Sequence, residues 1–75
     1  MKLHEGTIGG HYIVQHVKVD ENITRRLEAL GVNEQTSVMI LNKKGSGTLI
    51  IKVRGTRLAL GRQIASGIEV EESHE

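Results

Sequence analysis

Histidine and carboxylate side chains are the groups of this 75-residue chain that could ligate a metal ion, because cysteine is absent. The lack of cysteine also excludes disulfides and cysteine catalysis. His11 and His16 lie five residues apart in a segment with strand periodicity, so we expect them on opposite faces of a strand. His4 and His74 lie near the two ends. None of the four has the usual spacing of a metal site, so we predict exposed histidines, no bound metal and no cofactor.

Groups that could perform catalysis show no suitable arrangement. The four serines have no accompanying histidine and aspartate at a spacing that suggests a catalytic triad. Segment 45–47 has two glycines but lacks the lysine and hydroxyl residue of a phosphate-binding loop, so a hairpin turn explains it better. The paired glutamates Glu71 and Glu72 lie in an acidic tail, where no pocket is expected. The sequence therefore predicts a protein that is not an enzyme.

The first half of the chain predicts one strand followed by one helix. In residues 11–19 the side chains recur with a period of two, and β-branched residues are frequent, so the segment favours a strand. The inward face of this strand would carry Ile13 and Val17. Apolar residues then recur at positions 23, 27 and 30, which is the spacing of one helix face. Good capping residues at 20–22 precede this pattern, and Gly31 follows it. We therefore predict a short helix over Ile23–Leu30.

Residues 38–60 return to a period of two and predict a three-stranded meander with one apolar face. We expect the first hairpin to close at 44–47 and the second at Gly55–Thr56. The first register places Ile40 opposite Ile51, Val38 opposite Val53, Met39 opposite Lys52 and Leu41 opposite Ile50. The second register places Val53 opposite Leu58, Ile51 opposite Leu60 and Arg54 opposite Arg57.

The last segments complete a small closed fold. Segment 61–67 predicts one helical turn, and a last strand follows at Ile68–Val70. Five strands in so short a chain can close into a strongly bent barrel, so the predicted fold class is a small all-β barrel of about five strands with one short inserted α-helix. We expect a single domain over 1–75, with an ordered core at about 3–71 and a frayed acidic tail at 72–75. The expected buried residues are Ile13, Val17, Leu27, Leu30, Val38, Ile40, Leu49, Ile51, Val53, Leu58, Leu60, Ile64, Ile68 and Val70.

Composition excludes several classes of binding protein. A formal net charge of +1 provides no overall field for nucleic acid or an anionic membrane. The longest apolar run, at 38–41, is far shorter than the ~18 residues of a membrane helix, and no secretory signal precedes it, so we expect a cytoplasmic protein. Tyr12 is the only aromatic residue, so neither an aromatic groove for proline-rich peptides nor a stacking surface for bases is expected.

Three segments resemble the FeoA family, the small ferrous iron transport proteins A of bacteria. These are Arg25–Gly31, with the sequence RRLEALG, then Arg54–Leu60, with RGTRLAL, and Ile68–Val70, with IEV. The resemblance covers about residues 3–71. It implies an SH3-like β-barrel and a non-enzymatic accessory role in ferrous iron uptake. The partner that it implies is the cytoplasmic GTP-binding domain of FeoB, a membrane transporter.

Two alternative functions remain open from the sequence. One is a regulatory module, because a related barrel forms the C-terminal domain of DtxR-type iron regulators. The other is a small RNA-binding barrel, although we expect no nucleic acid. A weak homo-oligomer is also left open.

Basic and apolar side chains on the outside of the barrel are the candidates for partner binding. For the arginines, the competing interpretation is solvated positions or ion pairs within the chain, such as a network with Glu69 or Glu71. For the apolar residues, it is a second small core beneath the helix. The candidate residues are Arg25, Arg54, Arg57, Met39, Leu41 and Ile50.

Overall fold

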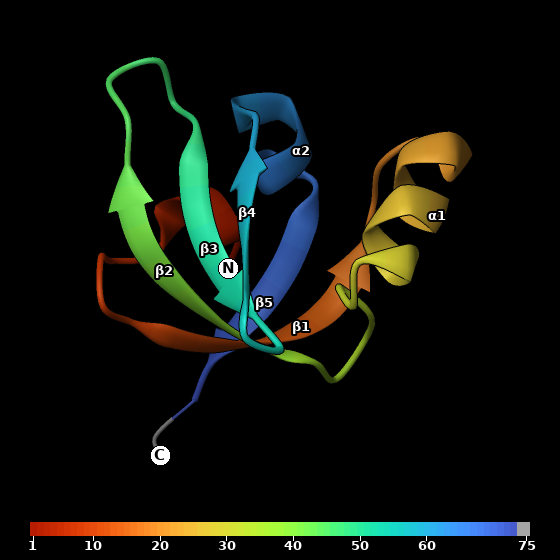
Figure 1. The fold of residues 1–75 in the computed structure, drawn as a ribbon, viewed down its shortest axis with the longest axis horizontal. Coiled ribbons are helices and arrows are strands. Elements are labelled where there is room, and N and C mark those ends of the chain that lie inside the picture. The colour runs from red at the N-terminus through yellow and green to blue at the C-terminus, as the bar shows by residue number, and fades with distance from the viewer. Residues whose placement is uncertain (74–75) are drawn as a thin grey trace.

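The computed structural model describes residues 1–73 and shows a strongly bent antiparallel sheet with short helices around it (Figure 1). The five strands are ordered β4-β3-β2-β1-β5. This arrangement confirms the predicted small all-β fold with an inserted helix. The elements are the 3-10 helix η1 (Leu3–Glu5), β1 (His11–Val17), α1 (Glu21–Ala29), β2 (Ser37–Lys43), β3 (Leu49–Val53), β4 (Thr56–Leu60), α2 (Arg62–Ser66) and β5 (Ile68–Glu72).

The core lies inside the bend of the sheet. Ile40 and Ile51 face each other across β2 and β3, as predicted, and both are completely buried. Leu3, in η1, is also completely buried, although the sequence pattern did not predict this helix. The predicted core residues that are buried are Leu27, Val38, Ile40, Leu49, Ile51, Val53, Leu60, Ile68 and Val70, and Val17, Leu58 and Ile64 are half-buried against them.

Before its bulge, strand β1 places the opposite set of side chains inward from the one predicted, whereas Val17, beyond the bulge, packs against the core as predicted. Tyr12 and Val14 are buried, whereas Ile13 is only half-buried. Two glycines make room for the tyrosine ring, because a Cβ atom on Gly6 or Gly10 would lie 2.8 Å or less from atoms of that ring. A bulge between Val14 and residue 16 then interrupts the alternation of the strand.

The β3–β4 hairpin turns one residue earlier than predicted. Arg54 and Gly55 occupy the turn, with φ angles of 51° and 79°, the positive values that a two-residue type I′ hairpin requires. The predicted pairs Val53–Leu58, Ile51–Leu60 and Arg54–Arg57 are therefore wrong. The observed pairs are Val53–Thr56, Lys52–Arg57, Ile51–Leu58 and Leu49–Leu60. The register differs by two residues, so each side chain keeps its predicted face of the sheet.

The β2–β3 hairpin agrees with the prediction near its open end and departs from it near the turn. Met39 pairs with Lys52, as expected. A register shift between Ile40 and Asn42 then places Asn42 opposite Ile50, so the predicted Leu41–Ile50 pair is wrong. The extra residue bends β2 and tilts Leu41 out of the regular ladder.

Helix α1 begins and ends at residues with clear capping roles. The Asp20 carboxylate accepts a hydrogen bond of 3.1 Å from the Ile23 N–H. At the other end, the N–H of Val32 donates to the Leu27 carbonyl at 2.8 Å, and Gly31 has a φ of 96°, which together form a Schellman motif. This turn carries Val32 into the core and leaves Leu30 48% exposed, so the predicted burial of Leu30 is wrong.

The C-terminal strand is longer than predicted. Strand β5 continues to Glu72, which pairs with Tyr12, so the expected fraying does not begin at residue 72. Positions 74–75, the rest of the predicted frayed tail, lie outside the described residues. No helix within residues 1–73 is long and apolar enough to cross a membrane.

Candidate protein-binding face

The outer surface of β2, β3 and β4 gathers apolar and basic side chains on one face. Cross-strand pairs place Met39 beside Lys52, Lys52 beside Arg57, and Ile50 beside Ala59. Met39, Leu41 and Ile50 are half-buried, whereas Lys52, Arg57 and Ala59 are exposed. We call this surface the meander face, and it consists of Met39, Leu41, Ile50, Lys52, Arg57 and Ala59.

A shallow hollow of about 480 Å³ lies on the meander face. Leu41, Ile50 and Arg57, three of the residues that the sequence predicted for partner binding, line it together. Asn42 and Lys44 complete the lining. The hollow therefore combines apolar side chains with two basic groups, a combination that can accept an apolar side chain flanked by a carboxylate.

Charges are unevenly distributed along the chain, and this determines the character of the meander face. Residues 35–68 contain six lysines and arginines and no aspartate or glutamate. This segment includes β2, β3, β4 and α2. The net charge of +1 conceals this separation, because all nine acidic residues lie in the two flanking parts of the chain. An uninterrupted run without acidic residues is the sequence signal that could have identified this face.

Arg57 lies opposite Lys52, so two like charges face each other on the outside of the sheet. Such a pair is unfavourable by up to about 1 kcal/mol relative to a neutral pair. Within residues 1–73, neither side chain makes an ion pair or a hydrogen bond. Among the described residues, neither Glu69 nor Glu71 forms the expected network with the arginines. Strand β5 lies at the opposite edge of the sheet, and the Glu69 carboxylate instead lies 3.8 Å from the N-terminal amine.

The other two predicted arginines lie away from the meander face. Arg25, on α1, pairs with Glu21 at 2.8 Å, which is the intrahelical ion pair that the alternative interpretation expected. Arg54, in the β3–β4 turn, donates from Nε to the Gly31 carbonyl at 3.4 Å, and its stem lies against that glycine. The structure therefore does not bring all six candidate residues together.

The apolar part of the meander face does not form a second core beneath α1. Ile23 and Leu27 of the helix pack with the main core inside the sheet. Met39, Leu41 and Ile50 lie outside that core cluster and remain partly accessible. They are therefore available to a partner.

The histidines are arranged differently from the prediction. Because of the bulge in β1, His16 pairs with Glu69 in the β5 register, while His11 pairs with Met39 in the β2 register, so both point to the outer face. The predicted opposition of these two side chains is therefore wrong. His16 Nδ1 lies 3.5 Å from the Glu34 carboxylate. Within residues 1–73, no three histidine, aspartate or glutamate side chains form a group that could hold a metal ion, and His74 lies outside that range.

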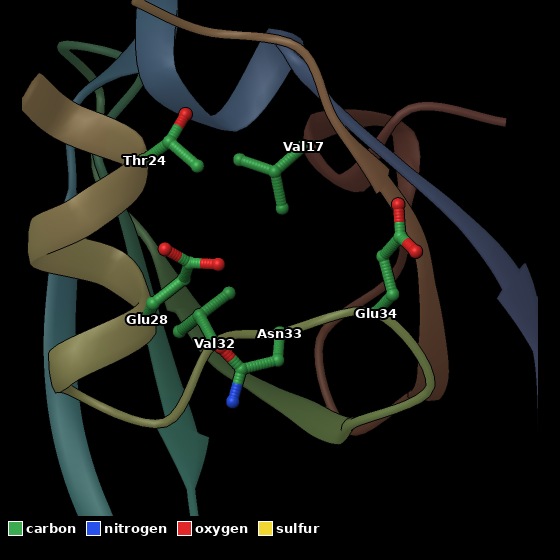
Figure 2. Close-up of a pocket in the computed structure, with 6 residues that line it drawn as sticks. All are labelled: Val17, Thr24, Glu28, Val32, Asn33 and Glu34. Atoms are coloured by element: carbon green, nitrogen blue, oxygen red, sulfur yellow. The ribbon is translucent and has the colours of Figure 1, made fainter. Parts of the chain in front are cut away.

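A second hollow of about 430 Å³ separates α1 from β1 (Figure 2). Figure 2 shows Thr24 and Glu28 reaching into it from α1 and Val17 from β1. Val32, Asn33 and Glu34 complete the lining, which contains two carboxylates and no basic side chain. Its charge is opposite to that of the meander face.

Comparison with protein families gives one match over nearly the whole chain. The model of the FeoA domain matches residues 1–72. No curated protein matches the chain.

Solved structures share this fold. The solution structure of FeoA from Chlorobium tepidum has a TM-score of 0.91 and 29% identity, and the match covers 96% of this chain and 70% of that chain. FeoA of Stenotrophomonas maltophilia, complexed with zinc, has a TM-score of 0.77 and 29% identity over 95% of this chain and 89% of that chain. That protein is described as a prokaryotic SH3 domain protein and a candidate activating factor of bacterial ferrous iron transport. These matches confirm the SH3-like fold that the sequence resemblance implied.

A manganese regulator contains a similar domain. The manganese regulator SloR has a TM-score of 0.81 and 20% identity, and the match covers 96% of this chain but 34% of that chain. At this level of identity, the similarity shows the fold alone.

Proposed function

The chain belongs to the FeoA domain family, which is associated with ferrous iron transport, and from this premise we propose that it is a non-enzymatic cytoplasmic accessory protein that binds a FeoB-type ferrous iron transporter. The part of the transporter that it contacts is the cytoplasmic GTP-binding domain. Binding occurs through the meander face and not through a metal or a catalytic group.

One observation supports this proposal most strongly. The hollow on the meander face combines Leu41, Ile50 and Arg57 within a segment that has six basic residues and no acidic residue. Arg57 has no counter-charge among residues 1–73, and its guanidinium group can form two parallel hydrogen bonds with one carboxylate. A transporter surface that presents an apolar side chain flanked by a carboxylate would therefore fill the apolar hollow and relieve the repulsion between Arg57 and Lys52.

RNA binding has less support from the same face. Single-stranded nucleic acids bind mainly by stacking their bases on exposed aromatic side chains. The only aromatic residue, Tyr12, is 3% exposed, and its hydroxyl group accepts a hydrogen bond of 2.8 Å from the Thr7 N–H. The basic groups therefore lack the stacking surface that they would need. The regulatory alternative is supported by similarity of fold alone.

The test is binding of the chain to the isolated cytoplasmic domain of the transporter, measured by calorimetry with and without guanine nucleotide. We expect Arg57→Glu to abolish or strongly weaken binding, with the loss largest at low salt. Arg25→Glu is the matched control, because it makes the same change of charge on α1, away from the meander face. If the two variants bind equally well, the meander face is not the contact surface. If the wild-type chain does not bind, the proposed partner is wrong.

A further inference from the structure

Strand β4 forms an edge of the sheet that no other described strand covers. Within residues 1–73, β4 is hydrogen-bonded to β3 alone, at the end of the order β4-β3-β2-β1-β5. The two-residue turn makes Val53 and Thr56 the hydrogen-bonded pair that closes the hairpin. Hydrogen-bonded and non-hydrogen-bonded pairs alternate from there, so Arg57 and Ala59 direct their backbone N–H and C=O groups away from β3. This edge therefore presents the pattern that an added strand would pair with.

The other edge of the sheet, strand β5, is covered by the N-terminal segment of the chain. The chain folds its own N-terminus along β5, where the Val70 N–H donates to the Met1 carbonyl at 2.8 Å and Lys2 forms a bridge with Glu69. An exposed strand edge favours unwanted association, and proteins usually cover or charge it. Here one edge is covered by the chain itself, and the other is left open and carries one basic side chain, Arg57, beside Lys52 of β3.

The charges beside β4 determine which strands can add to it. Arg57 is exposed on β4, Lys52 lies directly beside it on β3, and no acidic residue occurs anywhere between positions 35 and 68. A second copy that paired its own β4 with this edge would bring the same basic side chains together, which opposes self-association. An acidic strand would instead bring carboxylates next to uncompensated basic groups.

The two faces of β4 also indicate the pattern of the incoming segment. On the outer face, Arg57 and the small Ala59 would flank the side chains of an added strand. On the inner face, Leu58 is half-buried and would contact them. Because side chains of a strand alternate between faces, the complementary segment has acidic residues at every second position and apolar residues between them.

We propose that β4 is a site for β-strand addition by an extended acidic segment of a partner protein, with acidic and apolar residues alternating over about the five residues that match the length of β4. This inference deepens the proposed function, since it names the kind of segment that the meander face would recognise, and it rests in part on that function. Backbone pairing along β4 would provide affinity, and Arg57 would select acidic segments.

The test uses a synthetic peptide, so it does not depend on the transporter. The probe is an acetylated and amidated heptapeptide in which valine and glutamate alternate. It is titrated into the isotope-labelled chain and followed by amide NMR shifts. We expect saturable shifts centred on the amides of Arg57 and Ala59, and binding that weakens as salt rises. The matched peptide with lysine in place of glutamate is expected to cause no saturable shifts.

One change in the chain and one change in the peptide distinguish strand addition from simple attraction of charges. Ala59→Pro removes an N–H that points away from β3, so it leaves the hairpin ladder intact and is expected to abolish peptide binding. Ala59→Val retains the N–H and is expected to preserve binding. A glutamate–valine peptide that is N-methylated at every residue keeps its charge but has no N–H group on either edge, so it cannot pair along β4 and is expected not to bind. This peptide provides the decisive test if Ala59→Pro fails to fold.

Several outcomes would overturn the inference. Equal binding of the N-methylated peptide would show that charge alone attracts the probe. Concentration-dependent dimerisation in sedimentation that is lost in Ala59→Pro would show that a second copy occupies the edge. If Ala59→Pro binds the transporter domain normally while Arg57→Glu does not, the proposed function stands and strand addition is wrong. If the peptide binds but the transporter domain does not, strand addition stands and the proposed partner is wrong.

Discussion

Replacement of Ile51 by alanine gives the most direct test of how the sheet is assembled. Ile51 is completely buried and lies between Ile40 on β2 and Leu58 on β4. Truncation of a buried isoleucine to alanine costs about 2–5 kcal/mol, and a site enclosed on both sides should approach the upper part of this range, about 4 kcal/mol. A domain of this size has a free energy of unfolding of about 4–11 kcal/mol. The substitution therefore removes a large part of the total stability.

The assay is urea and thermal unfolding followed by circular dichroism. At about 4–8 °C per kcal/mol, the expected loss corresponds to a fall in Tm of about 16–32 °C. Ile51→Val should cost only about 0.5–1.5 kcal/mol, because it removes a single methylene group. Ile8→Ala is the matched control, since it removes the same atoms from a side chain that is 59% exposed, and it should change stability by no more than about 0.5 kcal/mol. If Ile51→Ala and Ile8→Ala cost the same, the placement of Ile51 at the centre of the core is wrong.

Four further substitutions test individual features. Arg54→Asn should raise Tm relative to Arg54→Ala, because both changes remove the contact with Gly31 but only asparagine tolerates the φ of 51° in the β3–β4 turn well, and equal Tm values would contradict this turn geometry. Gly67→Ala should cost about 1–3 kcal/mol, because its Cβ would lie 2.7 Å from the carbonyl oxygen of the residue that follows β1. Gly61→Ala, whose Cβ would have no neighbour within 4 Å, should instead preserve or slightly raise stability in the same denaturant titration. The hydrogen bond from the Lys2 N–H lowers the pKa of Glu5 below its ordinary value of 4.5, so the carboxylate stabilises the fold above that pH and the contribution is lost as the pH falls through the lowered pKa. The Tm difference between Glu5→Gln and the wild type should therefore be smaller at about pH 3 than near neutral pH, and a constant difference would contradict this role.

Strand β1 shows why the alternation of side chains in a strand can lead to a wrong prediction of the buried face. Positions 12–14 carry an aromatic residue followed by two β-branched residues, so local alternation does not distinguish between the two faces. The decision depends on Gly6 and Gly10, which leave space for the Tyr12 ring and lie outside the strand. Because this packing contact joins separate segments, the strand pattern alone could not reveal it.

The candidate site was predictable only in part. Leu41, Ile50 and Arg57 were correctly grouped on the outside of the meander, and they line one hollow. The partner of Arg57 was wrong, because the turn contains Arg54 rather than Thr56, and an arginine at positive φ is not a residue that turn preferences would select. The open edge of β4 could not be predicted, because the order of strands depends on long-range pairing.

The sequence by itself determined the fold class, the inserted helix with its caps, most of the core and the family. These features depend on periodicity, capping residues and short motifs, all of which are local. The tertiary structure decided which face of β1 is buried, where the strands shift register, which edge is covered and which charges lack a partner. Each of these depends on contacts between segments that are distant in the chain, such as Met1 with Val70. Several local patterns are compatible with more than one such arrangement, and only the packing of the complete chain selects among them.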